Sequence, residues 1–258
     1  MTRWTRSIGV LVATLFVLWV PARAQQPVDV TAYTTVTTTA TGTQNDFAPG
    51  LSWRTYLRCN NASLLTITGI TPGFDGQEIL IVADNAEVDL SSQDTGSVAA
   101  NRIVTMLSVA AGTKLPLKGS GFGVARLVYD AAASRWHERA HDQGGAIDYS
   151  TTSTITGWTS FTTKRLYYEV IGSRVFIDYD LEGTSNATTT SFTIPYTPSD
   201  VTLNLPVYAQ DSGGTFAFGV AIQSAATVNL APTAAGNMSG WTNSGTKVVI
   251  GHFSYQTN

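Results

Sequence analysis

The sequence predicts an all-β protein made of two small antiparallel β modules in series, the C-terminal one a β-sandwich or jelly roll. Composition is the first observation behind this prediction: 38 Thr, 21 Ser and 23 Gly make up 82 of the 258 residues. Thr favours half-exposed strands and Gly favours turns, whereas both are poor residues for helix interiors. The second observation is a series of short apolar runs separated by turn residues at hairpin-like spacing. Because 43% of the residues are hydrophobic, the chain can also build real cores.

The N-terminus has the pattern of a secretory signal peptide. Arg3 and Arg6 precede an apolar run over residues 8–20, and Ala22–Ala24 supplies the small residues of a cleavage site. The run is too short to cross about 30 Å of hydrocarbon as a helix. We therefore expect residues 1–24 to be removed and the protein to be secreted, periplasmic or exposed at the cell surface. An uncleaved anchor is the alternative.

Charge and cysteine content exclude several classes of partner and scaffold. Without the signal peptide, 12 Lys and Arg face 18 Asp and Glu, which is a net charge of −6. An acidic surface disfavours phosphate backbones and anionic lipid, so we expect no nucleic-acid partner and no membrane insertion after cleavage. Cys59 is the only cysteine, which excludes a disulfide within the chain, and we expect it to be buried as a small hydrophobic residue.

Four segments are expected after the signal peptide. Residues 25–50 are rich in Thr and poor in apolar residues, and predict an extended arm. Residues 51–140 predict the first β module. Residues 141–157 contain a Gly pair and a Ser/Thr-rich stretch, which indicate a linker. Residues 158–258 hold seven strand-like segments in about a hundred residues, as is typical of a β-sandwich.

The individual strands are predicted from apolar alternation. Alternate residues from Val175 to Leu181 are apolar or aromatic, which turns one face of this segment toward a core. A helical turn is expected only at Ala99–Leu107 or Ala131–Arg139. The expected strands are Leu64–Thr68, Glu78–Val82, Ile103–Leu107, Val124–Tyr129, Tyr167–Ile171, Val175–Leu181, Ser191–Ile194, Leu203–Ala209, Phe216–Ile222, Thr227–Leu230 and Lys247–Tyr255.

No segment predicts catalytic residues or a cofactor. Gln210–Gly214 resembles the nucleophile region of chymotrypsin-like proteases, but no His and Asp are placed to complete a triad with Ser212. Asp211–Phe216 also resembles the Asp-box hairpin of sialidases, in which the Asp caps backbone N–H groups of the turn. We therefore expect a hairpin turn here. Lys118–Gly123 predicts a turn rather than a nucleotide loop, because a strand and not a helix follows it.

The acidic and histidine residues predict no metal site. Asp84, Glu87 and Asp89 lie close together but lack the Gly of a calcium loop, so we expect them on solvated strand and loop faces. The histidines have no convincing metal-ligand spacing and are expected at the surface; they are His137, His141 and His252.

Aromatic residues are the best candidates for ligand binding, because their rings stack on sugars while their polar edges form hydrogen bonds. The alternative for each ring is packing in a core or between modules. The residues considered are Trp53, Trp136 and Tyr167 together with the four that we select as the candidate ligand-binding residues, Trp158, Tyr168, Trp241 and Tyr255.

Two stretches resemble β modules of phage tail fibres and tail-spike-type receptor-binding proteins. The first stretch, at about 60–138, resembles a small module with a Gly-x-x-Gly-Gln turn and a closing Trp. The second, at about 158–258, resembles a compact fibre-tip β-sandwich that ends on a strand. The segments that resemble these modules are Ile67–Val82, Asn101–Ile103, Leu127–Asp130, Ser134–Trp136, Tyr167–Ile177, Gly183–Thr188, Phe192–Pro195 and Ser244–Gly251.

The resemblance implies a homotrimer that recognises a cell-surface glycan or protein, and it supplies no catalytic residue. A virion protein needs no signal peptide, so the chain is expected to be either an exported protein that uses such modules or a phage-derived one. Our leading expectation is a non-enzymatic binding protein for a cell-surface ligand, most simply a glycan. The alternatives are a structural or spacer fibre protein without a ligand site and, third, a secreted hydrolase.

Overall fold

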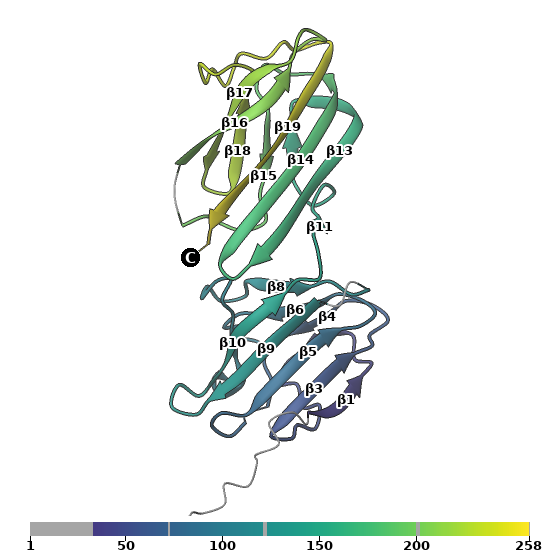
Figure 1. Ribbon diagram of the computed structural model, residues 1–258, viewed down its shortest axis with the longest axis vertical. Helices are drawn as coiled ribbons and strands as arrows, with labels where there is room; N and C mark the ends of the chain where they lie inside the picture. The colour runs from purple at the N-terminus through teal and green to yellow at the C-terminus, as the bar shows by residue number, and fades with distance from the viewer. Residues whose placement is uncertain (1–32, 72, 121–122, 200–201, 258) are drawn as a thin grey trace, which may run out of the picture. The chain divides into compact units, whose positions relative to one another are not determined.

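The structure, a computed structural model, describes residues 33–257 apart from 72, 121–122 and 200–201 (Figure 1). The expected signal peptide and residues 25–32 of the expected arm lie outside these residues. Tyr33–Asn258 forms one compact unit. Strands dominate it, and the described residues hold a single short 3-10 helix, η1 (Ala99–Asn101). The all-β prediction is confirmed.

The first module contains two sheets. The larger sheet has the strand order β1–β3–β5–β9–β10–β7, and the smaller one has the order β2–β4–β6–β8. The strands of the larger sheet are β1 (Thr34–Thr38), β3 (Arg54–Cys59), β5 (Glu78–Ala83), β9 (Gly123–Asp130), β10 (Arg135–Asp142) and β7 (Ile103–Val104). Those of the smaller sheet are β2 (Gly42–Gln44), β4 (Leu65–Ile67), β6 (Val88–Ser91) and β8 (Lys114–Leu117).

The first half of this module is a parallel coil, which differs from the antiparallel pairing we expected. β1, β3 and β5 pair in parallel, and so do β2, β4 and β6. Consecutive strands alternate between the two sheets, so each turn of the chain returns to the same sheet in the same direction. β8 and β9 then close the coil by pairing antiparallel to β6 and β5. The buried apolar side chains of both sheets, among them Leu57 and Leu65, form the core between them.

The prediction of a Thr-rich arm is wrong for the part of it that the structure describes. Thr34–Thr38 pairs with Thr55–Cys59, and Phe47 forms a bridge with Ile70. This segment is therefore the first turn of the coil. The low apolar content of Thr34–Thr38 suits an edge strand, because most of the side chains of this strand face solvent and Val36 is the one that packs against the core.

Of the two ranges in which a helical turn is expected, Ala99–Leu107 contains η1, and Ala131–Arg139 forms no helix. The Asp130 carboxylate accepts the Ala133 N–H at 3.0 Å, and Ser134 has a φ of 50°. These features form a tight turn between β9 and β10, and β10 already begins at Arg135. The chain is therefore a hairpin here.

The C-terminal module is a single nine-stranded sheet that curls on itself (Figure 1). The contact between its two halves is seen in the rings of Tyr179 and Phe192, whose centroids are 5.0 Å apart. In the order of the sheet, the strands are β11 (Ile147–Asp148), β13 (Trp158–Ile171), β14 (Arg174–Ser185), β19 (Thr246–Gln256), β16 (Thr202–Gln210), β17 (Ala217–Ser224), β18 (Thr227–Ala231), β15 (Ser191–Thr193) and β12 (Ile155–Thr156).

The expected linker at 141–157 is largely structured. β10 extends through Asp142, β11 pairs with β13 and β12 pairs with β15. The Ser/Thr-rich composition does not indicate these short strands. They lie at the edges of the sheet, where little apolar surface is buried, so they need few apolar residues. The hairpin turn expected around Asp211 is present between β16 and β17. The Asp211 carboxylate, however, accepts the N–H and hydroxyl of Thr242 rather than N–H groups of its own turn.

Direct hydrogen bonds join the two modules at a region that we call the junction. It consists of residues 105–114 and the end of β10 on one side, and Val170, Tyr196 and Thr257 on the other. The Tyr196 hydroxyl donates to the Lys114 carbonyl at 3.0 Å, and the Thr257 hydroxyl donates to the Leu107 carbonyl. These contacts build a cavity at the junction.

Candidate functional site

Two of the four predicted ligand-binding residues form a cage around a buried lysine. Trp158 is 7% exposed, Trp241 is 2% exposed and Lys247 is fully buried between them. The Lys247 ammonium lies 5.3 Å from the Trp158 ring centroid and 4.9 Å from that of Trp241. Both indole N–H groups donate to backbone carbonyls, those of Lys247 and Leu230. These tryptophans therefore pack in the core, where little of either ring is accessible to a ligand.

The other two predicted residues, Tyr168 and Tyr255, are also largely buried, at 7% and 2% exposed. The Tyr255 hydroxyl oxygen accepts the Tyr196 N–H at 3.4 Å, and the Tyr255 ring packs in the core. Tyr168 shares its face of β13 with the buried Leu166 and Val170, but its ring also reaches the wall of the junction cavity. Only Tyr168 among the four thus lies at a candidate site.

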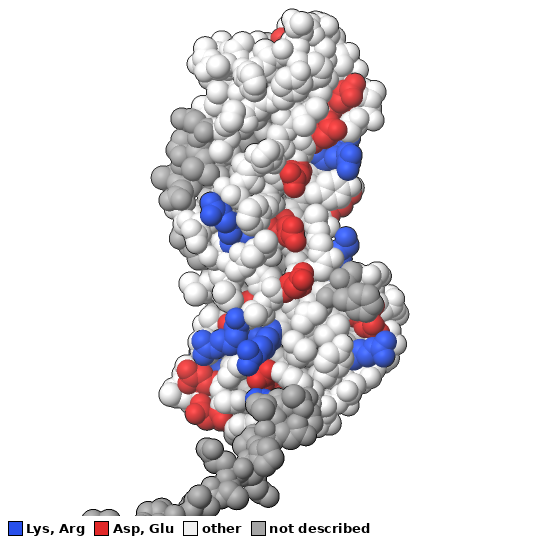
Figure 2. Space-filling model, in the orientation of Figure 1, with Lys and Arg blue, Asp and Glu red and all other residues white. Residues whose placement is uncertain are grey.

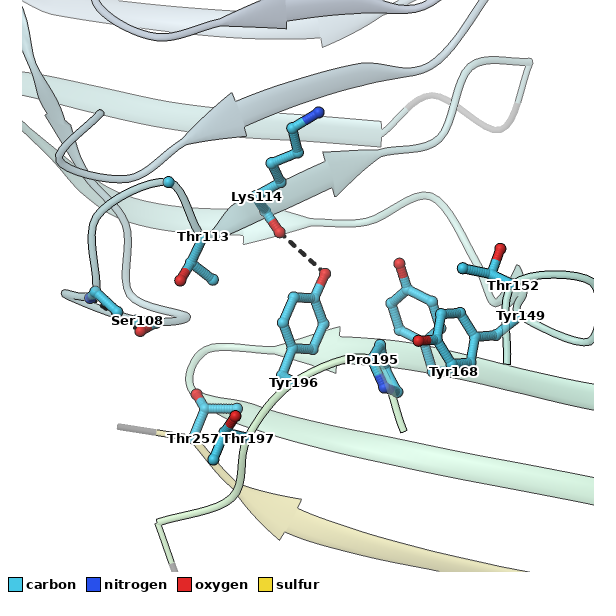
Figure 3. Close-up of a pocket in the computed structure, with 12 residues that line it drawn as sticks. Ser108, Thr113, Lys114, Tyr149, Thr152, Tyr168, Pro195, Tyr196, Thr197 and Thr257 are labelled. Atoms are coloured by element: carbon cyan, nitrogen blue, oxygen red, sulfur yellow. Dashed lines mark hydrogen bonds between the residues drawn. The ribbon is translucent and has the colours of Figure 1, made fainter. Parts of the chain in front are cut away.

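The junction cavity has a volume of about 520 Å³ (Figure 3), within the range of small-molecule sites. The segment that carries Ser108, Thr113 and Lys114 forms one wall, and the C-terminal module forms the other. Eight of its lining residues have a hydroxyl group. The lining consists of Ser108, Ala110, Gly112, Thr113, Lys114, Tyr149, Thr152, Tyr168, Pro195, Tyr196, Thr197 and Thr257.

Three tyrosines are held at fixed angles in this cavity. Tyr168 packs edge-to-face against Tyr149 and against Tyr196, with both centroid distances at 5.8 Å and interplanar angles of 88° and 83°. Figure 3 shows Tyr149 and Tyr168 side by side, with Tyr196 hydrogen-bonded to the opposite wall. Because edge-to-face packing restrains ring rotation, the cavity presents aromatic surfaces that are already oriented.

The lining of the cavity contains one charged residue, Lys114, and its charge is paired. Burial raises the pKa values of Tyr168 and Tyr196, so both phenols keep their protons at physiological pH. The Lys114 ammonium forms a 3.1 Å salt bridge with Asp89, and Figure 3 shows its side chain directed away from Tyr196. Asp89 is itself buried, unlike the solvated position expected for it, and desolvation raises the pKa of its carboxyl. The cavity therefore offers hydroxyl groups and ring faces rather than unpaired charges.

A second surface feature, the aromatic patch, lies on the outer face of the C-terminal sheet. It consists of Tyr208, Phe216, Phe218 and Ile250, of which Phe218 is 73% exposed. Tyr208 and Phe216 stack with centroids 4.4 Å apart. Figure 2 shows Asp and Glu side chains along the β13–β14 part of this face, whereas the part formed by β16 and β17 carries almost no charge in that view.

The described residues give no sign of a metal centre or of a membrane span. Within them, no three His, Cys, Asp or Glu side chains are arranged to hold a metal ion. No helix among them is long and apolar enough to cross a bilayer. Cys59 is buried as expected, and burial raises the pKa of its thiol to about 12.

Comparisons with known proteins assign no family to the chain. No protein-family model matches it, and no curated protein matches it. Its chemistry must therefore be judged from the junction cavity and the aromatic patch themselves.

Proposed function

We propose that the protein is a non-enzymatic binding protein that recognises a cell-surface glycan through the junction cavity. The observation that supports this most strongly is the lining, which combines three oriented tyrosines with Ser and Thr hydroxyls and whose one charged residue, Lys114, is paired with Asp89. A sugar ring has the matching chemistry, because its C–H face packs on an aromatic ring and its hydroxyls exchange hydrogen bonds with neutral donors and acceptors. The exported or virion-associated location expected from the sequence is part of this proposal.

The groups that line the cavity favour binding of a sugar over hydrolysis of it. The lining contains neither a carboxylate nor a histidine, whereas glycoside hydrolysis uses two carboxyl groups on either side of the scissile bond. Two acids, Glu87 and Asp89, act electrostatically on Tyr168; they are hydrogen-bonded to each other, and Asp89 also pairs with Lys114. Neither of them lines the cavity, so the lining itself offers no acid–base pair for cleaving a sugar linkage.

Replacing Tyr149 with Ala is expected to weaken glycan binding about tenfold, because one ring of the cavity wall is lost. Tyr149 packs against the core but is only half-buried, so its removal costs the core less than removal of the buried Tyr168 would. The test screens galactose-, glucose- and N-acetylglucosamine-terminated trisaccharides by saturation-transfer NMR and then titrates the best of them by calorimetry. The control is Trp53→Ala, which removes an exposed ring of the first module. Equal affinities of Tyr149→Ala and the wild type, or no binding in the screen, would contradict the proposal.

A structural role in a fibre is the second candidate, and the aromatic patch is the observation that favours it. Exposed aromatic and aliphatic side chains on one sheet face are typical of protein–protein contact surfaces. In this role the patch would hold copies of the chain together in a homotrimer, as the tail-fibre resemblance implies. The glycan site and the trimer can coexist.

Replacing Phe218 with Asp is expected to dissociate such a trimer into monomers, because a carboxylate in an apolar contact would be desolvated without a partner. Size-exclusion chromatography with light scattering measures the mass directly. Val98→Asp, at another exposed apolar position, serves as the control and should stay trimeric. A monomeric wild type removes this second candidate.

A further inference from the structure

We propose that the buried pair of His141 and Glu138 is a proton-dependent latch that holds the two modules together and so regulates the junction cavity. The regulation of glycan binding rests on the proposed function, whereas the latch itself is defined by contacts that need no ligand.

Both side chains of the latch are fully buried, and each bonds to another element. His141 Nδ1 lies 2.5 Å from the Glu138 carboxylate, and His141 Nε2 lies 3.1 Å from the Val170 carbonyl of β13. The second Glu138 oxygen accepts the Met106 N–H at 2.7 Å. The surface position expected for His141 is therefore wrong. The pair joins β10, the segment around Met106 and the C-terminal module.

A β-bulge places both residues on the inner side of β10. Residues three apart on a regular strand point to opposite faces. Here the pairing with β9 shifts register between Glu138 and Ala140, and a bulge of one residue reverses the alternation that follows it. Trp136 and Glu138 before the shift and Gln143 after it are all buried. The bulge thus builds the His–Glu pair.

The hydrogen-bond geometry requires a proton between His141 and Glu138. A carbonyl oxygen only accepts, so Nε2 must carry a proton to bond with Val170. A second proton must then lie between Nδ1 and the Glu138 carboxyl group, because two unprotonated acceptors cannot bond to each other. A neutral imidazole beside an ionised Glu138 has one N–H and would leave one of these contacts as two facing acceptors. Loss of the proton therefore breaks a buried hydrogen bond, which is costly when no water replaces it.

The latch and the cavity share two segments of chain. On β13, Val170 contacts His141 while Tyr168, two residues earlier on the same face, lines the cavity. On the other side, Met106 bonds to Glu138, Leu107 accepts the Thr257 hydroxyl, and Ser108 lines the cavity. A change at the latch thus reaches both walls of the sugar site through directly connected residues.

The charged groups around His141 favour its protonated form. Desolvation acts against the imidazolium, but the hydrogen bond and charge of Glu138, the Val170 carbonyl and the charge of Asp142 outweigh it and raise the pKa of His141 above its usual value. From β13, Glu169 lines the same small cavity as His141. From β9, the paired residue is the neutral Ala125. The latch is therefore complete below pH about 6.5 and weakens as the pH rises through the raised pKa of His141.

The experiment follows the latch in the full protein without ligand. NMR of ¹³C-labelled histidine gives the pKa of His141, and hydrogen exchange from pH 5.5 to 9.5, corrected for intrinsic rates, gives the protection of residues 105–113. We expect the protection factors of these residues to fall as the pH rises through the pKa of His141. The total fall should be about tenfold for each unit by which this pKa exceeds about 6.5. His252→Gln, at an exposed histidine, should leave this profile unchanged, and His141→Gln should remove its pH dependence. An unshifted His141, or protection that is constant over this range, would overturn the latch.

Titration of the best trisaccharide across the same pH range then separates the two proposals. Affinity that falls together with junction protection supports regulation of the site. Binding with a pH-independent affinity overturns the regulation and leaves the glycan function standing. No binding at any pH overturns the glycan function, while hydrogen exchange alone decides the latch.

Discussion

Replacing Trp136 with Ala is expected to lower the free energy of unfolding by about 3–5 kcal/mol, which is the usual cost of removing a fully buried large aromatic ring. Trp136 is 0% exposed and packs at 62° against Tyr129, with centroids 5.1 Å apart. Its indole N–H donates to the carbonyls of Ile70 and Thr71. The ring therefore ties the hairpin of β9 and β10 to the parallel coil, and urea unfolding followed by circular dichroism measures its loss.

Two further variants separate burial from hydrogen bonding at this position. Trp136→Phe keeps a ring but leaves the Ile70 and Thr71 carbonyls without this donor, so a loss of about 1–3 kcal/mol is expected. Trp53→Ala removes a ring that is 54% exposed and only stacks on Phe74, so its effect should stay below that of Trp136→Phe. A Trp136→Ala protein as stable as Trp53→Ala would contradict the position of Trp136 in the core.

The free energy of unfolding of the wild type is expected to rise with pH more than that of the Lys247→Met variant does. The difference between the two proteins should change by about 2 kcal/mol between pH 7 and 9.5. Desolvation lowers the pKa of Lys247 to about 8, against about 10.4 in an unfolded chain. Between these values the unfolded state binds more protons than the folded state, so raising the pH favours folding. Below pH 8 the ammonium is charged in both states, and its bonds to Gly157, Ala187 and Thr190 satisfy it.

The measurement is urea unfolding of both proteins at a series of pH values, because their difference cancels the titration of the buried tyrosines and of Cys59. Lys164→Met, at an exposed lysine of β13, is the matched control and should show no such trend. A difference between the wild type and Lys247→Met that is constant from pH 7 to 9.5 would show that Lys247 is not desolvated by its tryptophan cage.

The antiparallel strands were predictable because their patterns are local. Alternation from Val175 to Leu181 marks β14, and the apolar runs at 124–129 and 247–255 mark β9 and β19. The parallel coil was not predictable in this way, since its register depends on pairing between segments of dissimilar sequence. Thr34–Thr38 shows the difficulty, because as an edge strand it needs no apolar side chains of its own.

The candidate site was less accessible to sequence reasoning than the fold. Tyr168 was selected as an exposed ring, although its alternation with Leu166 and Val170 indicates an inward face. Tyr149 lies in a stretch expected to be a linker, and Tyr196 meets Lys114 across 82 residues, a contact that no local pattern reveals. His141 was expected at the surface because the bulge in β10 that turns it inward has no clear sequence signal.

The most direct test of the glycan site is NMR of protein with ¹³C-labelled tyrosine rings, assigned with single Tyr→Phe variants and titrated with the best trisaccharide of the screen. We expect the signals of Tyr149, Tyr168 and Tyr196 to shift together and to saturate with one dissociation constant, while that of Tyr208 on the aromatic patch stays unchanged. Shifts confined to Tyr208, or no shift of the three cavity tyrosines at saturating trisaccharide, would contradict the assignment of the junction cavity as the glycan site.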